Sequence, residues 1–520
     1  MGLRRRSVLA GIAGAFLSAQ AQAATELVLA VPDLPTVIEP QLAFTPLERA
    51  VARELFLGLV TYDASGALVP GLAESWTVSD DGLTYTFALR QNAVWSDGTP
   101  IIAADAQFAL VRAATPATRA PFAGLLAPIA GAAGLRAGTA RDIEVKTSGR
   151  HTLRITLTAR NARFLEVLAQ PVAAPIPRAQ VTKLGADWGL AGRLVTSGAF
   201  LAGASPDSFT LSRNSRAVLP GNSDLIRFER TASFTEAAAR VRAGRAHAAW
   251  GFAPEMVAER ELNAVLKPAP GQALMYVAVN GTRPKLGERI ARHALGMVIE
   301  RETLVRNLRL SNAAFDAAPG YGAVPPAARA DSTLHLAPYQ RIGADDRLTI
   351  AQVLVTEVDV DAAHPYNVGL AYPTGRIAAA IAKGVAASWA KIGFRAELQE
   401  RSAAEHARVL HNGDYDLAIA TSDSRDATPW PYLEFLSAAA GPDNFVRYAE
   451  PDFDRHLADA VALFEPELIA KSLGAAEEML AQDQIILPLF VFTPLDAVGK
   501  VTGWEANARG LHPLRLLGPG

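Results

Sequence analysis

The sequence predicts an α/β protein with more than one domain, and three observations support this class. The chain has 520 residues, which is more than one hydrophobic core usually accommodates. Segments with a strand-like pattern alternate with helical ones, as at 368–372, 374–392 and 394–398, and this order is typical of an α/β sheet. Half of the residues are hydrophobic and 20% are charged, as in ordinary globular proteins.

Residues 1–23 have the pattern of a cleaved export signal. Three arginines at 4–6 precede an apolar run at 8–17, and Ala21 and Ala23 form an A-x-A cleavage pattern. The run has about ten residues, whereas a membrane-spanning helix needs roughly 20. The arginines and the following Ser-Val-Leu are similar to a twin-arginine signal, and the general secretory route is the alternative. We expect cleavage near Ala23 and a mature protein outside the cytoplasm with no membrane span.

Composition excludes several classes of function. Without the three leader arginines, 47 basic residues stand against 52 acidic ones, a net charge of −5, so there is no basic excess for nucleic acid. The chain has no cysteine, which excludes disulfides, thiolate metal sites and a cysteine nucleophile. Neither G-x-S-x-G, H-E-x-x-H nor a Walker loop occurs. We read His406 and His411 as surface residues, and we expect no enzyme activity, cofactor or metal site.

The first elements in order are a strand from residue 25 and a helix at 47–57, which Gly58 can end. The stretch 68–110 then predicts strand, turn, strand, turn and helix. Its aromatic residues are predicted to be core: Trp76, Tyr85, Phe87 and Trp95. The helix after Pro100 has no side-chain cap, because Ile and Ala follow the proline.

The rest of the chain predicts further alternating elements. Strands are predicted at 141–146, 151–158, 209–213, 225–230, 246–250, 276–280, 368–372, 394–398 and 414–419, and helices at 233–243, 288–299 and 374–392. A polar loop, 420–430, follows the strand at 414–419. Such loops, at the carboxyl ends of strands, bind ligands in open α/β sheets.

Three linked motifs in the stretch 68–110 carry a family resemblance. They are P-G-L-A-E-S-W at 70–76, D-D-G-L-T-Y-T-F-x-L-R at 80–90 and W-S-D-G-T-P at 95–100. Together they resemble the signature of the peptide-type extracellular solute-binding proteins that serve ABC importers (solute-binding family 5). Further similar segments, such as G-Y-G-A-V-P-P at 320–326, extend the resemblance over nearly all of residues 25–520.

The resemblance implies a two-lobed periplasmic-binding-protein type II fold with an additional small α/β domain on the first lobe. The implied division is listed by residue number: signal peptide 1–23; first lobe 24–59, 191–279 and 488–520; extra domain 60–190; second lobe 280–487.

The resemblance also implies two ligand-binding segments. In the first lobe, Ala43, Phe44 and Thr45 stand where the backbone would pair with a bound peptide, with a plain surface loop as the alternative. In the second lobe, an aspartate would hold the ligand's α-ammonium. Asp423 is preferred over Asp426, although the aromatic neighbours usual in the family are absent. The other implied binding residues are Ser422, Ser424 and Trp430.

The implied function is that of a periplasmic solute-binding component of an ABC importer. It would capture oligopeptides or peptide-like solutes by hinge closure and deliver them to a permease through a transient contact. We expect a monomer. The alternatives are the same fold binding a non-peptide solute, such as an opine, oligosaccharide, haem or metal chelate, or a secreted hydrolase or chaperone.

Overall fold

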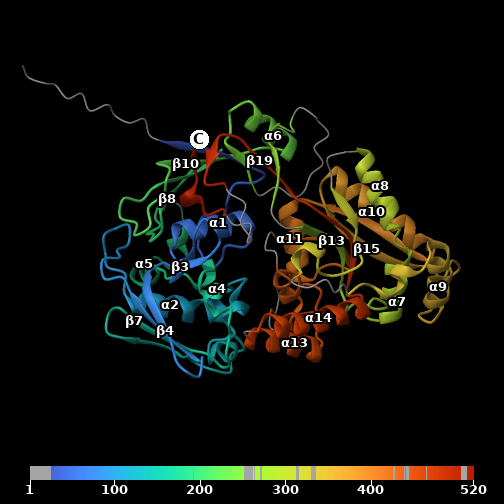
Figure 1. Ribbon diagram of the computed structural model, residues 1–520, viewed down its shortest axis with the longest axis horizontal. Helices are drawn as coiled ribbons and strands as arrows, with labels where there is room; N and C mark the ends of the chain where they lie inside the picture. Colours follow the sequence, from blue (N-terminus) through green and yellow to red (C-terminus); the bar gives the residue numbers. More distant parts are fainter. Residues whose placement is uncertain are drawn as a thin grey trace, which may run out of the picture.

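The computed structural model describes residues 25–190, 192–205, 207–250, 262, 264–269, 272–311, 316–329, 335–424, 428–438, 440, 444–463, 465–504 and 512–520. The predicted export signal lies outside these residues, as does Asp426. Figure 1 shows two lobes side by side, the first built from both ends of the described chain and the second from its middle.

The first lobe contains a seven-stranded mixed sheet. Its strands are, in spatial order, β12 (Leu266–Pro268), β19 (Leu495–Val498), β11 (Ala248–Ala249), β1 (Glu26–Val31), β10 (Leu225–Arg230), β9 (Ser208–Arg213) and β8 (Phe200–Ser205). β1 runs parallel to both β10 and β11, and the other pairs are antiparallel. Helices α1 (Pro46–Leu55) and α6 (Phe234–Arg242) bury apolar faces against this lobe.

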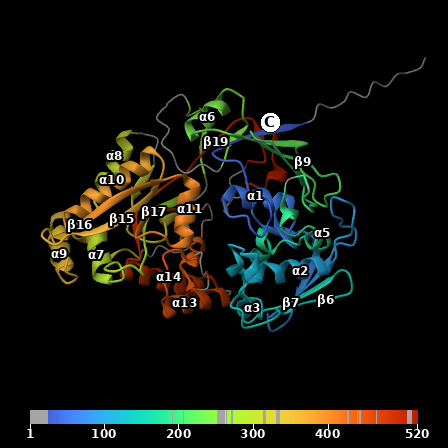
Figure 2. The same cartoon turned by 180° about the vertical axis from the view of Figure 1, so that it is seen from behind.

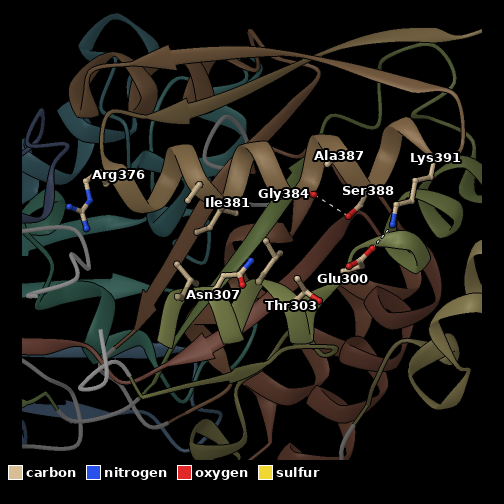
Figure 3. Close-up of a pocket in the computed structure, with 12 residues that line it drawn as sticks. Glu300, Thr303, Asn307, Arg376, Ile381, Gly384, Ala387, Ser388 and Lys391 are labelled. Atoms are coloured by element: carbon tan, nitrogen blue, oxygen red, sulfur yellow. Dashed lines mark hydrogen bonds and ion pairs between the residues drawn. The ribbon is translucent and has the colours of Figure 1, made fainter. Parts of the chain in front are cut away.

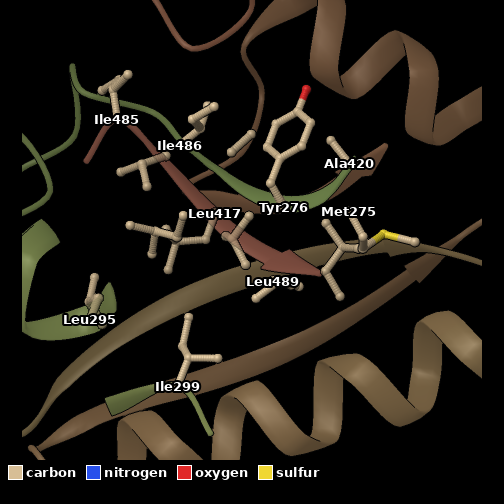
Figure 4. Close-up of a cluster of buried hydrophobic side chains, with 14 of the residues drawn as sticks. Met275, Tyr276, Leu295, Ile299, Leu417, Ala420, Ile485, Ile486 and Leu489 are labelled. Carbon is tan, nitrogen blue, oxygen red and sulfur yellow. The ribbon is translucent and has the colours of Figure 1, made fainter. Parts of the chain in front are cut away.

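The second lobe contains a six-stranded mixed sheet. In spatial order the strands are β14 (Ala317–Pro319), β18 (Ile486–Phe492), β13 (Gln272–Val279), β17 (Leu417–Ser424), β15 (Tyr366–Pro373) and β16 (Phe394–Arg401). The helices are α7 (Arg289–Val298), α8 (Arg301–Ser311), α9 (Ala344–Thr356), α10 (Arg376–Ala390), α11 (Ala403–Asn412), α12 (Trp430–Leu433), α13 (Pro451–Ala462) and α14 (Pro466–Asp483). Figure 4 shows part of the core, where β13, β17 and β18 contribute Tyr276, Leu417 and Leu489.

A smaller domain lies below the first lobe in Figure 1 and has a core of its own. Its antiparallel sheet has the order β4 (Ala73–Val78), β5 (Thr84–Leu89), β7 (Thr152–Thr156) and β6 (Val145–Ser148). The remaining elements of this region are the hairpin β2 (Val60–Tyr62) and β3 (Leu68–Pro70), with α2 (Ala103–Ala114), α3 (Ala132–Arg136), α4 (Phe164–Leu168) and α5 (Arg178–Leu184). A last pair, β20 (Val501–Thr502) and β21 (Gly518–Pro519), closes the chain.

The stretch 68–110 folds as the sequence predicts, with strands β4 and β5 followed by helix α2. Tyr85, Phe87 and Trp95 are buried, so the alternating aromatics do build a core. α2 begins without a side-chain cap from its N-cap residue, as predicted. The Asp105 carboxylate instead accepts a hydrogen bond from the backbone N–H of Ile102 at 3.1 Å. An acidic side chain one turn into the helix therefore satisfies the exposed end.

The chain passes between the lobes through a two-stranded antiparallel ribbon. β12 pairs with β19 in the first lobe, and β13 pairs with β18 in the second. Between these pairs, the N–H of Ala269 donates to the carbonyl of Pro494 at 2.8 Å. The predicted lobe boundaries at 279/280 and 487/488 are therefore wrong. Both fall at or inside strands of the second sheet, because β13 and β18 are hydrogen-bonded to each other there. In the described residues, the chain leaves the first lobe after Ala269 and returns to it between 492 and 495.

Candidate ligand site between the lobes

Strand β17 has one edge that is only partly paired. All eight of its residues pair with β13, from Leu417 opposite Val279 to Ser424 opposite Gln272. On the other side, β15 pairs only with Leu417 and Ala418. The sequence predicted a loop from residue 420, and this is wrong as far as Ser424, because the long ladder to β13 keeps the chain extended. Residues 419–424 thus form a strand with a neighbour on one side among the described strands.

Two hydrogen bonds fix which backbone groups point to that edge. The carbonyl of Asp416 accepts from the N–H of Asn280, which follows β13, at 3.0 Å. The carbonyl of Ile419 instead accepts from the ring of His406 in α11 at 2.8 Å. Backbone groups alternate in direction along a strand, so even-numbered residues of β17 point to β13 and odd-numbered ones point away. The N–H and C=O of Thr421 and Asp423 therefore point to the edge that β15 leaves unpaired.

His406 is buried, with 5% of its surface exposed, so the prediction of a surface residue is wrong. Because a carbonyl can only accept, Nε2 carries the hydrogen in the bond to Ile419. Nδ1 is buried and has no partner among the described residues. Burial lowers the pKa of His406, which keeps the ring neutral. His406 thus donates a hydrogen bond to the carbonyl of Ile419, the residue that follows the last pairing of β17 with β15.

The first-lobe segment 43–45 lies directly before α1 and uses its backbone donors internally. The N–H of Ala43 donates to the carbonyl of Glu39 at 3.0 Å. The N–H groups of Phe44 and Thr45 donate to the carboxylate of Glu48 at 3.1 and 3.0 Å. The Thr45 hydroxyl accepts from the N–H of Glu48, which completes a capping box. All three N–H groups of the segment are therefore bonded. The Thr45 carbonyl accepts from the N–H of Arg49 at 3.0 Å, which leaves the carbonyl oxygens of Ala43 and Phe44 as the backbone groups that the segment can offer.

The ring of Phe44 reaches the second lobe. It stacks on Phe122 of the small domain with centroids 6.2 Å apart, and its other neighbour is His411 of α11, edge-on at 5.3 Å. Figure 2 shows α11 on the side of the second lobe that faces α1. The predicted first-lobe residue thus lies at a contact between the lobes.

Trp430 also lies between the lobes. Its half-buried ring stands beneath the guanidinium of Arg163, from the small domain, at 4.7 Å from the ring centroid. Arg163 also pairs with Glu434 of the second lobe at 2.7 Å, and the N–H of Ala162 donates to the carbonyl of Val461 in α13 at 3.1 Å. Sequence reasoning selected Trp430 but missed Arg163 and Glu434, which no motif marks.

The predicted residues therefore gather in two groups. Ala43, Phe44 and Thr45 lie on the first-lobe side. Ser422, Asp423 and Ser424 end β17 on the other, and Trp430 follows six residues later. Ser422 is half-buried, and its backbone pairs with Leu274.

A separate cavity of about 350 Å³ lies within the second lobe (Figure 3). Arg376 stands at one end of it, and the ion pair between Lys391 and Glu300 stands at the other. Its lining comes from α8, α10 and the residues next to them, and none of it from the first lobe. The cavity therefore does not belong to the inter-lobe site.

Among the described helices, none combines the length and apolar content that crossing a bilayer requires. No cluster of three or more His, Asp or Glu side chains in the described part of the chain has an arrangement that could hold a metal ion.

Comparisons with known proteins place this geometry in context. The sequence model of "Bacterial extracellular solute-binding proteins, family 5 Middle" matches residues 67–444. The periplasmic oligopeptide-binding protein OppA of Salmonella typhimurium is 26% identical over 90% of this chain and 86% of its own length. The periplasmic murein peptide-binding protein MppA of Escherichia coli is 27% identical over 90% of this chain and 88% of its own.

Solved structures share the fold. Haemophilus influenzae OppA in complex with the peptide RPPGFSPFR superposes with a TM-score of 0.85 at 24% identity, covering 96% of this chain and 99% of that one. A structure of Escherichia coli MppA superposes with a TM-score of 0.84 at 24% identity, covering 96% of this chain and 99% of that one. An unliganded open form of MppA gives a TM-score of 0.65 at 25% identity, covering 96% of this chain and 98% of that one.

Proposed function

Because the chain belongs to family 5 of the bacterial extracellular solute-binding proteins, we propose that it is the periplasmic binding component of an ABC importer for oligopeptides or peptide-like solutes. The lobes close around the ligand by bending between the strand pair β12–β19 of the first lobe and the strand pair β13–β18 of the second. The closed form then delivers the ligand to a permease through a transient contact. The protein acts as a monomer, without catalysis and without a cofactor.

The observation that carries this proposal is the edge of β17 that has no partner strand in the described part of the chain. At Thr421 and Asp423 the strand offers backbone donors and acceptors to an extended ligand. Pairing through the main chain holds any peptide regardless of its side chains. An edge of this kind on a soluble protein otherwise invites aggregation, so a use for it within a closing cleft is expected.

Three further contacts complete the proposed site. The Asp423 carboxylate pairs with the ligand's α-ammonium, since a charge-assisted contact is strong in a cleft that excludes water. Ser422 and Ser424 flank it, and Trp430 forms one wall of a side-chain pocket. Across the cleft, the carbonyl oxygens of Ala43 and Phe44 accept hydrogen bonds from the ligand's backbone.

The leader at 1–23 supports export to the periplasm, with cleavage near Ala23. The relatives OppA and MppA are both periplasmic proteins. Their binding of peptides supports the ligand class proposed for this chain.

Native mass spectrometry of the protein purified from the periplasm of its own cells tests the ligand class. We expect a set of bound peptides of several sequences, because backbone pairing does not select side chains. If the only co-purifying molecules are non-peptide solutes, such as a bile acid, an opine or a metal chelate, the peptide proposal is wrong. A bile acid is a real competitor, since one relative, of Escherichia coli, is a probable deoxycholate-binding protein.

Asp423→Asn tests the proposed ammonium anchor. It removes the charge and keeps the shape, so peptide affinity should fall by about 10- to 100-fold, the usual cost of breaking one charge-assisted hydrogen bond. Asp97→Asn, at an exposed turn, is the matched control and should leave affinity as it is. Equal affinity for Asp423→Asn and wild type would remove Asp423 from the site, while the backbone edge of β17 would remain.

A further inference from the structure

Arg163 stands between carboxylates of two different lobes. Its guanidinium pairs with Glu166, three residues later in the small domain, at 2.9 Å. It pairs with Glu434 of the second lobe at 2.7 Å. One pair lies within the small domain and survives any movement of the lobes, whereas the other exists only when the lobes are together.

The same guanidinium covers the ring of Trp430 at 4.7 Å from its centroid. A cation over an indole face adds attraction to that of the ion pair. Burial disfavours the charge on Arg163, but the carboxylates of Glu434 and Glu166 outweigh this effect and raise its pKa. Arg163 therefore stays charged and makes two kinds of contact with one short segment of the second lobe.

That segment is directly connected to the strand proposed to hold the ligand. Trp430 and Glu434 lie six and ten residues after Ser424, where β17 ends. The hydroxyl of Tyr432, between them, donates to the carbonyl of Gln272, the residue that pairs with Ser424. A ligand that shifts the end of β17 therefore also shifts the surface that Arg163 contacts.

We propose that Arg163 is an electrostatic latch: Glu166 holds its guanidinium ready in the open protein, and Glu434 and Trp430 receive it on closure, so that the latch prolongs the closed state. The proposal rests on the hinge closure proposed above, but not on the ligand being a peptide. Arg163 is a positioning residue, since it contacts Trp430 and not the ligand strand. Ala162, bound through its backbone to Val461, extends the same contact.

The latch can be measured as an equilibrium between open and closed protein. The chain has no cysteine, so Ala133→Cys and Val353→Cys, both at exposed positions on opposite lobes, can carry two fluorophores for single-molecule energy transfer. Arg163→Gln and Glu434→Gln each remove one side of the ion pair. Arg154→Gln, at an exposed arginine of the same small domain, is the control with the same charge change as Arg163→Gln. Each protein is measured alone and with a tryptic digest of casein, and its melting temperature is recorded.

We expect the closed-to-open ratio to fall about five- to tenfold in Arg163→Gln, which loses the partly exposed ion pair and the cation–π contact. In Glu434→Gln, which loses the ion pair alone, it should fall about two- to fivefold. The control should behave as wild type, and melting temperatures should agree. Raising salt to about 0.5 M should lower the wild-type ratio and leave the variants nearly unchanged, because screening acts on the ion pair.

An unchanged ratio in either latch variant overturns the proposal, as does a wild-type protein that never populates the closed state under either condition. A separate outcome concerns the ligand class. If the latch variants lower the ratio but the casein digest does not shift it in wild type, the latch stands and the peptide proposal is contradicted.

Discussion

The two backbone segments of the proposed site, 43–45 and the end of β17, differ in how their backbone groups are hydrogen-bonded. In the first lobe, all three N–H groups of residues 43–45 are already bonded, two of them to the carboxylate of Glu48. In the second lobe, the edge of β17 keeps the groups of Thr421 and Asp423 away from β13, beyond the last pairing with β15. The first segment is held by its own lobe, whereas no strand among the residues described in the structure pairs with the second segment along this edge.

This difference separates two tasks. A segment whose donors are satisfied holds its shape without a ligand and can act as a rigid wall. A strand with an open edge gains hydrogen bonds only when something lies along it. We therefore expect changes in the first segment to reduce stability first, and changes in the second to reduce binding first.

The largest effect should come from Glu48→Ala. Its buried carboxylate accepts hydrogen bonds from Thr36, Val37, Phe44 and Thr45. Removing it takes the partner from four donors in part-buried hydrogen bonds, so the free energy of unfolding should fall by about 3–5 kcal/mol. Chemical denaturation measures this change.

The matched control is Glu74→Ala, an exposed position in β4, which should change stability by less than about 0.5 kcal/mol. A loss for Glu48→Ala no larger than that of the control would mean that segment 43–45 is not held by Glu48, and the contrast between the two segments would disappear.

Prolines at successive positions of β17 should separate binding from stability. Ser422→Pro removes an N–H that points to β13 and should cost about 3 kcal/mol of stability. Thr421→Pro removes an N–H that points to the open edge, where proline is tolerated, so stability should change little while ligand affinity falls. Denaturation and titration with the casein digest measure the two quantities. If both prolines reduce stability equally, the assignment of odd-numbered residues to the open edge is wrong.

The smallest effect concerns pH. Because burial lowers the pKa of His406, the unfolded chain binds more protons than the folded one below the ordinary histidine value. The contribution of the neutral His406 ring to stability is therefore complete above about pH 6.5 and is lost as pH falls towards the lowered pKa. The free energy of unfolding changes by at most about 1.4 kcal/mol per pH unit from one such group.

His406→Gln keeps a donor for the Ile419 carbonyl and does not titrate, so thermal denaturation across this range should show a shallower pH dependence. His293, whose pKa burial also lowers, should account for part of the remainder. A slope that is unchanged in His406→Gln would show that the ring is not buried as a neutral group in solution.

The sequence predicted most elements because their signals are local. The helix at 233–243 and the strand at 225–230 appear as α6 and β10, since periodicity and caps lie within each segment. The motif stretch predicted β4, β5 and α2 with their turns, and Gly82 and Gly98 there adopt the positive φ that those turns require.

The sequence could not supply what depends on distant partners. Ser422 to Ser424 read as a loop because polar residues are poor strand formers, and only the ladder to β13, some 150 residues earlier, makes them a strand. His406 stands between Glu405 and Arg408 in the sequence, yet its ring is buried and donates to the carbonyl of Ile419, 13 residues later. The pairing of Arg163 with Glu434 joins residues that nothing in the sequence connects.

The two neighbouring crossings between the lobes also make the second lobe a unit that could be exchanged as a whole. Its two ends meet at the hydrogen bond between Ala269 and Pro494, so residues between them leave the first lobe and return to almost the same place. Domains whose ends lie close together can be exchanged without disturbing their host. A chimaera that joins this first lobe to the second lobe of a relative should therefore fold, carry the relative's ligand strand, and lack the Arg163 latch unless Glu434 is transplanted with it.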